Sequence, residues 1–283
     1  MPKDFDELLE GTIAHLGSLR TAGTRFISVR AETLEALRQA PHSPSPARAS
    51  DHSEINGINH VPSEPGPLPD EMANVPDKKS ADMAHLRTRA LACIQCPNLA
   101  SSRKNVVFGV GNIHSPLMFV GEAPGADEDT QGEPFVGKAG QLLTRIIQTM
   151  GFSRDSVYIA NILKCRPDTP GQTSGNRHPT PQEIQTCLPY LLAQIDIIKP
   201  RVIVALGGTA IEGLFGTGDG ISRKRGNWLT FRDVPVMPTY HPAYLLRNQA
   251  LSEKRKVWED MLKVLEKLEL PITDKQRGYF LKP

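Results

Sequence analysis

Residues 180–206, TPQEIQTCLPYLLAQIDIIKPRVIVAL, place a helix and a strand in direct succession and decide the fold class. Thr180, Pro181 and Glu183 fit the N-cap, N1 and N3 positions of a helix, because a threonine hydroxyl and a glutamate carboxylate can accept from the free N–H groups of a first turn. The short apolar segment 202–206 is typical of a strand that is covered on both faces. We therefore expect an α/β unit with a parallel sheet.

The same alternation continues on both sides of this stretch. Strands are predicted at 117–121, 157–161, 202–206 and 235–240. Helices are predicted at 83–93, 139–150, 181–198, 208–215 and 252–268. This pattern favours an α/β fold, a three-layer αβα sandwich with a four-stranded, mainly parallel sheet. In such sheets, ligands bind beyond the carboxyl ends of the strands.

The first 80 residues differ in composition from the rest. Apolar spacing predicts helices at 5–20 and 31–40, so residues 1–40 are interpreted as a small helical N-terminal module. Segment 41–80 holds eight of the 24 prolines and no aromatic residue, which is typical of a disordered linker. The α/β domain is then expected to occupy 81–283.

Composition narrows the classes of function. Residues 1–80 carry 8 Lys and Arg against 12 Asp and Glu, which leaves 25 against 19 for the rest of the 283 residues. That balance is compatible with a polyanionic partner without requiring one. Apolar runs such as 202–206 are far shorter than the roughly 20 residues that cross a bilayer, and the N-terminus lacks the pattern of a secretory signal. We expect a cytoplasmic protein that does not insert into membranes.

Four cysteines form a C-x2-C pair, Cys93 and Cys96, followed by the single residues Cys165 and Cys187. Unrelated free cysteines would behave as small apolar residues, and a cytoplasmic location disfavours disulfides. The pair is different, because two thiolates at this spacing can bind one metal centre. Four thiolates suit either a zinc ion or an iron–sulfur cluster, and the spacing leaves both open. In either case the expected role is structural.

Glycine-rich and polar motifs follow two of the predicted strands. After strand 117–121 comes a glycine-rich, acidic turn, and then the segment 132–140, in which Phe135 is framed by proline and glycine so that one aromatic face is presented. Asn161 leaves the next strand with one acceptor and two donors, enough to read the edge of a planar ring that carries an amide. An ordinary acidic turn and a turn cap are the alternative interpretations.

The last predicted strand runs into TYHPAYLLRN at 239–248. His241, held by the proline that follows it, can donate a hydrogen bond to a developing anion, although a single histidine is more often a packing residue. The apolar tip 244–246 is expected to be exposed on a loop beside Arg247. An exposed apolar tip next to arginine is typical of wedges that enter a nucleic-acid stack.

Taken together, GEAPGADEDTQGEPFVGKAG, NILKCRP, PTPQEIQTC and TYHPAYLLRN resemble the family 4 uracil-DNA glycosylases, the iron–sulfur class of their superfamily. The resemblance covers about residues 83–268. It implies hydrolysis of the N-glycosidic bond between uracil and deoxyribose in DNA, a base excision repair step that leaves an abasic site. It also implies uracil-containing DNA as partner, a 4Fe-4S cluster on the four cysteines and no other cofactor. We expect a monomer that acts at the nucleoid of a bacterial cytoplasm.

The resemblance also implies roles for individual residues. Phe135 would stack on the flipped base and Asn161 would bind its polar edge, in a pocket that begins with Gly121 and Ala123. His241 would donate to the uracil as negative charge develops. The other implied roles are positioning of water by Asn176, support of the turn or of the sugar charge by Glu122 and Glu128, and filling of the vacated stack by Tyr244, Leu245 and Arg247.

The sequence departs from the usual pattern of the superfamily in two places. Ala123 stands where its best-known members have an activating aspartate. The loop 166–175 is longer than the turn common in family 4, which weakens the matching of Asn176. A related class traps uracil-DNA covalently through a histidine in this loop. His178 raises that alternative, although the Arg-Arg-Ile-His stretch of that class is absent.

Two further classes of function stay open at this point. The first is a non-catalytic DNA-binding or polymerase-associated module that keeps the fold as a scaffold. The second is an iron–sulfur electron carrier, which would leave the pocket motifs without an explanation. In each case we interpret residues 1–40 as a docking module for another repair or replication protein.

Overall fold

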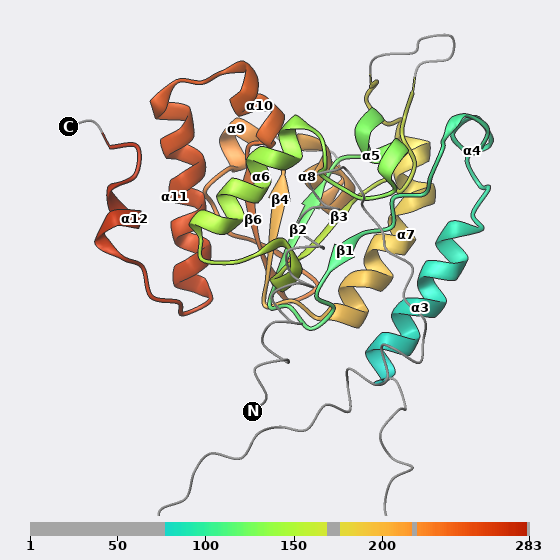
Figure 1. Cartoon of the computed structure of the whole chain (residues 1–283), viewed down its shortest axis with the longest axis horizontal. Helices are drawn as coiled ribbons and strands as arrows, with labels where there is room; N and C mark the ends of the chain where they lie inside the picture. The colour runs from blue at the N-terminus through green and yellow to red at the C-terminus, as the bar shows by residue number, and fades with distance from the viewer. Residues whose placement is uncertain (1–76, 169–175, 217–219, 282–283) are drawn as a thin grey trace, which may run out of the picture. The chain divides into compact units, whose positions relative to one another are not determined.

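The computed structural model describes residues 77–168, 176–216 and 220–281, so the N-terminal helices predicted at 5–20 and 31–40 lie outside the described part. A six-stranded sheet forms the centre of the domain, with the strand order β1-β3-β2-β4-β6-β5 (Figure 1). The strands are β1 Val110–Gly111, β2 Leu117–Gly121, β3 Tyr158–Asn161, β4 Val202–Leu206, β5 Leu229–Phe231 and β6 Val234–Thr239.

The four inner strands β3, β2, β4 and β6 are the four that the sequence predicts, and they run parallel. The α/β fold class is therefore confirmed, but the sheet has six strands instead of four. The additional strands β1 and β5 lie at the two edges and pair antiparallel with their neighbours. They have only two and three residues and stay partly exposed, so no apolar run marks them in the sequence.

Helices cover both faces of the sheet (Figure 1). The longer helices are α3 Lys78–Leu91, α6 Lys138–Thr149, α7 Pro181–Ile198, α8 Gly208–Phe215 and α11 Leu251–Lys267, which correspond to the five predicted ones. The short helices are α4 Pro97–Ser102, α5 Ala126–Gln131, α9 Ile221–Lys224, α10 Pro242–Arg247 and α12 Asp274–Gly278, with a 3-10 turn η1 at Arg154–Ser156.

Side chains of β2 divide between two apolar cores, one on each side of the sheet. Met118 and Val120 belong to the core that includes Leu191 of α7, whereas Leu117 and Phe119 belong to the core formed with α6 and α11. Successive side chains of a strand point to opposite faces, so a strand that is apolar at every position must be covered twice. This explains the three layers.

Helix α7 begins as its sequence predicts. The backbone N–H of Glu183 donates to the Thr180 hydroxyl at 3.2 Å, and the N–H of Thr180 donates to the Glu183 carboxylate at 2.8 Å. These reciprocal bonds satisfy two otherwise free donors of the first turn.

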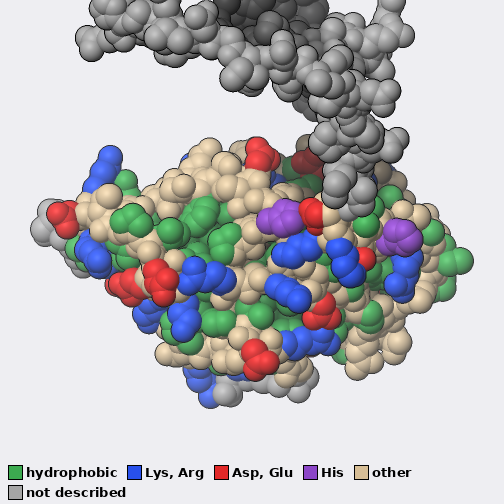
Figure 2. Space-filling model, turned by 90° about the horizontal axis from the view of Figure 1, so that it is seen from below, with side chains coloured by type: hydrophobic (Ala, Val, Ile, Leu, Met, Phe, Trp, Pro, Cys, Tyr) green, Lys and Arg blue, Asp and Glu red, His purple; other side chains and the backbone are tan. Residues whose placement is uncertain are grey.

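Among the described residues, no helix combines the length and apolar character that a membrane crossing requires. Seen from below the view of Figure 1, the surface carries positive and negative side chains interspersed with one another (Figure 2). Charge alone therefore does not locate a binding site on that face.

Candidate active site at the carboxyl ends of the strands

The carboxyl ends of the parallel strands bring distant motifs together. Gly121 and Asn161, the last residues of β2 and β3, are direct partners in the sheet. His241 follows β6 by two residues, and its ring centroid lies 5.6 Å from that of Phe135. The aromatic ring, the amide and the imidazole predicted from sequence are thus placed around one edge of the sheet, where such folds bind ligands.

Gly121 leaves room for this cluster. A Cβ atom at Gly121 would lie 2.4 Å from Cζ of Phe135 and 2.5 Å from Oδ1 of Asn161, closer than real atoms approach. The glycine is therefore required because the two side chains converge above its backbone.

Changing Gly121 to alanine should lower kcat/KM for a base-excising reaction by roughly 10- to 100-fold, since a shift of about 1 Å in a binding side chain has effects of that size. Gly278→Ala, at a position where a Cβ would meet nothing within 4 Å, is the matched control. Steady-state kinetics on a uracil-containing oligonucleotide provide the measurement. Equal kcat/KM for the two variants would contradict the steric argument.

The side-chain oxygen of Asn161 is buried without a hydrogen bond. Asn161 is 2% exposed, and its Oδ1 is an acceptor with no hydrogen-bond partner among the described residues. Such an orphan acceptor costs about 1–3 kcal/mol, so it is uncommon outside functional sites. A ligand with an N–H donor in a planar ring would satisfy it.

The backbone of Phe135 is held in a left-handed conformation, with φ of 55°. Arg154 fixes this conformation by donating to the carbonyl oxygens of Phe135 at 3.1 Å and Pro134 at 2.8 Å. Gly140 packs directly below, where a Cβ would lie 1.8 Å from the Phe135 oxygen. The role of Arg154 could not be predicted from the sequence, because no local pattern connects an arginine before β3 with a loop 19 residues earlier.

Glu128 holds the glycine-rich turn together. Its carboxylate accepts three backbone N–H groups, from Gly125 at 3.0 Å and from Val136 and Gly137 at 2.9 Å each. These bonds connect the turn after β2 with the segment that carries Phe135. Of the two roles that the resemblance implies for Glu128, these contacts match support of the turn.

Replacing Glu128 with glutamine should lower the free energy of unfolding by about 1–3 kcal/mol, because an amide NH2 group cannot accept the N–H bonds of one carboxylate oxygen. The matched control is Glu133→Gln, which changes an exposed carboxylate of the same segment. Urea unfolding followed by circular dichroism measures both. Identical midpoints would show that the three backbone bonds contribute nothing to stability.

His241 is held as a neutral imidazole. It is the N-cap of α10, and its Nδ1 accepts the N–H of Ala243 at 3.2 Å, so the ring proton lies on Nε2. Burial, with a smaller contribution from Arg247, lowers the pKa of His241 to about 4. At neutral pH the ring therefore offers an uncharged N–H donor at Nε2.

A second polar group lies next to Gly121. The Thr209 hydroxyl donates to Glu122 at 2.5 Å, and Nδ1 of His178 lies 3.7 Å from the other Glu122 oxygen. Nε2 of His178 lies 3.5 Å from Glu212 of α8. Thr209 was not predicted as a site residue, although its position at the start of a helix that follows β4 could have indicated one.

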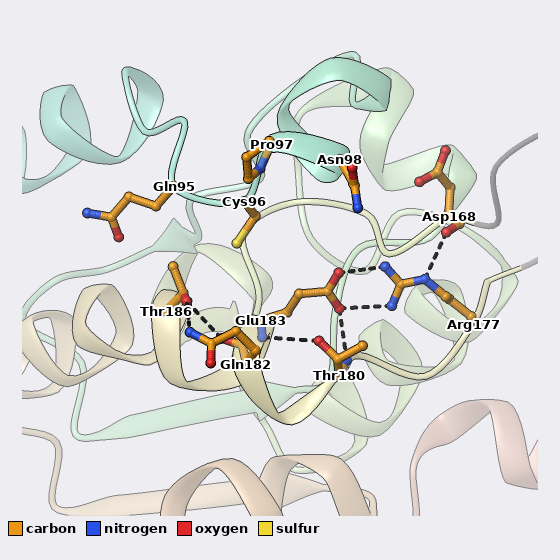
Figure 3. Close-up of a pocket in the computed structure, with 10 residues that line it drawn as sticks. All are labelled: Gln95, Cys96, Pro97, Asn98, Asp168, Arg177, Thr180, Gln182, Glu183 and Thr186. Atoms are coloured by element: carbon orange, nitrogen blue, oxygen red, sulfur yellow. Dashed lines mark hydrogen bonds and ion pairs between the residues drawn. The ribbon is translucent and has the colours of Figure 1, made fainter.

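Asn176 and His178 belong to a segment that is anchored to α7. Arg177 between them donates through both terminal nitrogens to Glu183, the N3 residue of the capping box, and through Nε to the carbonyl of Asp168 (Figure 3). Asn176 accepts from Arg166 at 2.9 Å. Its amide nitrogen would lie 3.2 Å from a Cβ on Gly125, so Asn176 faces the glycine-rich turn.

The tip after His241 differs from the prediction. Residues 242–247 form helix α10 instead of a loop, and Leu245 is buried at 5% exposure against Tyr240 and Val257. The expected exposed apolar tip is therefore wrong for Leu245. Arg247 is exposed, and Tyr244 is half-buried, its ring tilted against that of Tyr240 with 4.5 Å between ring centroids. Pro242 begins the helix because its fixed φ suits the first turn.

All four cysteines line one cavity, together with Leu99, Arg103, Leu163 and Thr186. Arg103 donates to Sγ of Cys165 at 3.1 Å and to the carbonyl of Cys93 at 2.7 Å. The backbone N–H of Lys164 donates to Sγ of Cys187 at 3.2 Å. Burial raises the pKa of Cys187 to about 12, because the cavity solvates its thiolate poorly.

The cysteine cavity is small, with a volume of about 20 Å³. Within 77–168, 176–216 and 220–281, no three His, Cys, Asp or Glu side chains form a group that could hold a metal ion. Cys96 and Thr186 also line a neighbouring pocket of about 480 Å³, which the Arg177–Glu183 pair borders (Figure 3).

Comparison with known proteins identifies the class. Residues 108–262 match the model of the uracil DNA glycosylase superfamily, and the chain belongs to this superfamily. The type-4 uracil-DNA glycosylase of Thermotoga maritima is 48% identical over 179 residues, 62% of this chain and 88% of that protein. That of Archaeoglobus fulgidus is 43% identical over 172 residues, 58% and 83% of the two chains. A type-5 uracil-DNA glycosylase of Pyrobaculum aerophilum is 28% identical over 192 residues, 56% and 82%. The family predicted from the motifs is confirmed.

Proposed function

We propose that this chain hydrolyses the N-glycosidic bond of deoxyuridine in DNA, releasing uracil and leaving an abasic site. Membership of the superfamily and the names of the type-4 relatives support this function. The observation that carries the proposal is that Phe135 and Asn161 converge above Gly121 at the strand ends, with the His241 ring 5.6 Å from that of Phe135.

The base is selected by the amide of Asn161. Uracil inside a duplex must be flipped out at a cost of a few kcal/mol, after which Phe135 stacks on it. The buried Oδ1 of Asn161, which lacks a partner, accepts the N3–H of uracil. Cytosine has an acceptor at this ring position, so the same atom rejects cytosine.

The leaving group is stabilised by His241. Cleavage of the bond places negative charge on the uracil ring, and Nε2–H of a neutral imidazole donates to it most strongly in the transition state. Asn176 positions the attacking water, and Glu122 stabilises positive charge on the sugar. Tyr244 and Arg247 contact the DNA strand.

The activity should not decline as the pH rises from about 5.5 to 8, because the pKa of His241 near 4 keeps the active neutral form fully populated. If the imidazolium were the donor, kcat/KM would fall about tenfold per unit above its pKa. Single-turnover excision at constant ionic strength measures this. A loss with a midpoint near 6.5 would contradict the neutral donor.

The cysteine cavity supports a 4Fe-4S cluster on Cys93, Cys96, Cys165 and Cys187. All four cysteines line one cavity, and four thiolates are a ligand set that suits an iron–sulfur cluster. N–H donors from Arg103 and Lys164 face two of the sulfurs. When bound, the cluster supplies a rigid connection between the entry segment, the loop after β3 and helix α7.

Three further proposals concern the whole chain. The catalytic domain spans 81–283, and residues 1–40, joined by the linker 41–80, dock another repair or replication protein. The enzyme works as a monomer on DNA at the nucleoid of the cytoplasm. Deleting residues 1–76, which stops before the N-cap of α3 at Asp77, should leave excision from naked DNA unchanged, and collapse of the remaining domain would refute this division.

The test of the proposed function is release of free uracil from a uracil-containing oligonucleotide by the full chain. Cleavage of the abasic product by alkali detects it, and intact DNA would refute it. Salt-sensitive binding without release would indicate a non-catalytic module instead. A protein–DNA adduct that survives denaturation would indicate covalent trapping, for which His178→Ala is the diagnostic variant.

A further inference from the structure

We infer that Lys164 is a positioning residue, which holds the base-reading Asn161 in register and connects it to the cysteine cavity. This inference rests on the proposed function and adds to it a residue that the family motifs do not place in the reaction.

The Lys164 side chain is directed at the backbone of Asn161. Its Nζ donates to the Asn161 carbonyl oxygen at 3.0 Å and to Oε1 of Gln194 at 2.6 Å. The side chain is among the largest fully buried ones, and the residue is 2% exposed. A lysine is rarely buried this completely, because removing an ammonium from water is costly unless its partners are fixed.

The partners are fixed. Nε2 of Gln194 donates to the Phe108 carbonyl and to the Tyr158 hydroxyl, each at 2.9 Å. Gln194 itself is 0% exposed on helix α7. The acceptor oxygen that receives the ammonium therefore cannot rotate away, and the Lys164 side chain has one arrangement.

Hydrogen bonds also fix the main chain of Lys164, on the side of the cysteine cavity. Its N–H donates to Sγ of Cys187, and its carbonyl accepts from the N–H of Val107 at 2.7 Å. The next residue is Cys165. The turn from Asn161 to Cys165 thus has its pocket end fixed by Nζ and its cysteine end fixed by backbone bonds.

Through Lys164, the cysteine cavity is connected to Asn161 in the proposed base-binding pocket. The turn after β3 is short, and Lys164 braces it from within. A methionine could fill the same space at lower desolvation cost, so packing alone does not account for an ammonium here. What a lysine adds is a pair of hydrogen bonds, which tie the Asn161 carbonyl to the fixed side chain of Gln194.

A double-mutant cycle tests the inference. In the full-length enzyme, Lys164→Met should lower single-turnover kcat/KM on uracil-DNA by roughly 10- to 100-fold, the effect of a displaced binding group. In an Asn161→Ala background the same change should cost less than about threefold, because the residue that Lys164 positions is already absent. Multiplicative losses in the double mutant would overturn the inference, since a general structural effect does not depend on Asn161.

Two controls separate this outcome from damage to the fold. Lys79→Met removes a different lysine, one that donates to the main-chain carbonyl of Ile198 at 3.0 Å outside this network, and it should stay within about twofold of the wild type. Lys164→Met should keep its affinity for undamaged DNA but lose preference for DNA that carries non-hydrolysable 2′-fluoro-deoxyuridine, measured by fluorescence anisotropy. An unchanged preference would also overturn the inference.

A second variant keeps the test decisive if Lys164→Met does not fold. Gln194→Met leaves the lysine in place but removes its second acceptor, and it should give a smaller loss that again disappears in the Asn161→Ala background. Uracil release by the wild type is scored in the same assay. If the wild type releases no uracil, the proposed function fails; if it does and the variants behave additively, only the role of Lys164 fails.

Discussion

Replacing His241 with serine is expected to lower kcat by about 10²- to 10³-fold, the usual effect of removing one donor to a developing anion. KM should change only a few-fold, because the donor acts mainly in the transition state. Serine suits this test, since it is also a good N-cap and can accept the Ala243 N–H that His241 now accepts. Helix α10 is therefore retained, and the loss reports on Nε2–H.

The matched control for this variant is His85→Ser, which removes an exposed imidazole from the outer helix α3. It should have the kcat of the wild type. The assay is single-turnover release of uracil, with circular dichroism to compare helix content. A His241→Ser enzyme with full kcat would remove the imidazole from the chemistry, even though its ring lies beside Phe135.

The elements of this fold were predictable where the sequence carries local signals. Helix α7 follows from the capping residues Thr180 and Glu183, and the buried inner strands follow from apolar runs. The edge strands β1 and β5 were not predictable, because an edge strand needs only a few residues and one neighbour. Helix α10 was missed for a different reason: Pro242 was interpreted only as holding His241 and the tip 244–246 as a loop, whereas proline at a first helical position is equally a start signal.

The residues of the candidate site were likewise predictable only where a local sequence signal marks them. Phe135, Asn161 and His241 each lie next to a recognisable strand end or turn, so topology alone brings them to one edge of the sheet. Arg154 and Thr209 were missed because their importance depends on contacts between segments far apart in the chain. No spacing rule encodes a hydrogen bond from η1 to the carbonyl of Phe135.

Changing Cys187 to serine is expected to abolish cluster binding and to destabilise the whole domain. Cys187 lies on α7, whereas Cys93, Cys96 and Cys165 come from two other segments, so one missing ligand disconnects three parts of the chain. A bound metal centre contributes its binding free energy to folding. A loss of about 4 kcal/mol would lower Tm by roughly 8–16 °C for a domain of this size.

Thr186→Ser is the matched control for Cys187→Ser, because Thr186 lines the same cavity and serine preserves its hydroxyl. Iron content, visible absorption and thermal unfolding distinguish the two variants. Wild type and Thr186→Ser should be brown and should melt together, and Cys187→Ser should be colourless and less stable. A colourless wild type with one zinc ion per chain would contradict the cluster, and would favour the alternative that cysteine spacing alone leaves open. A colourless Cys187→Ser with unchanged Tm would contradict the structural role, since the three segments would then hold together without the metal centre.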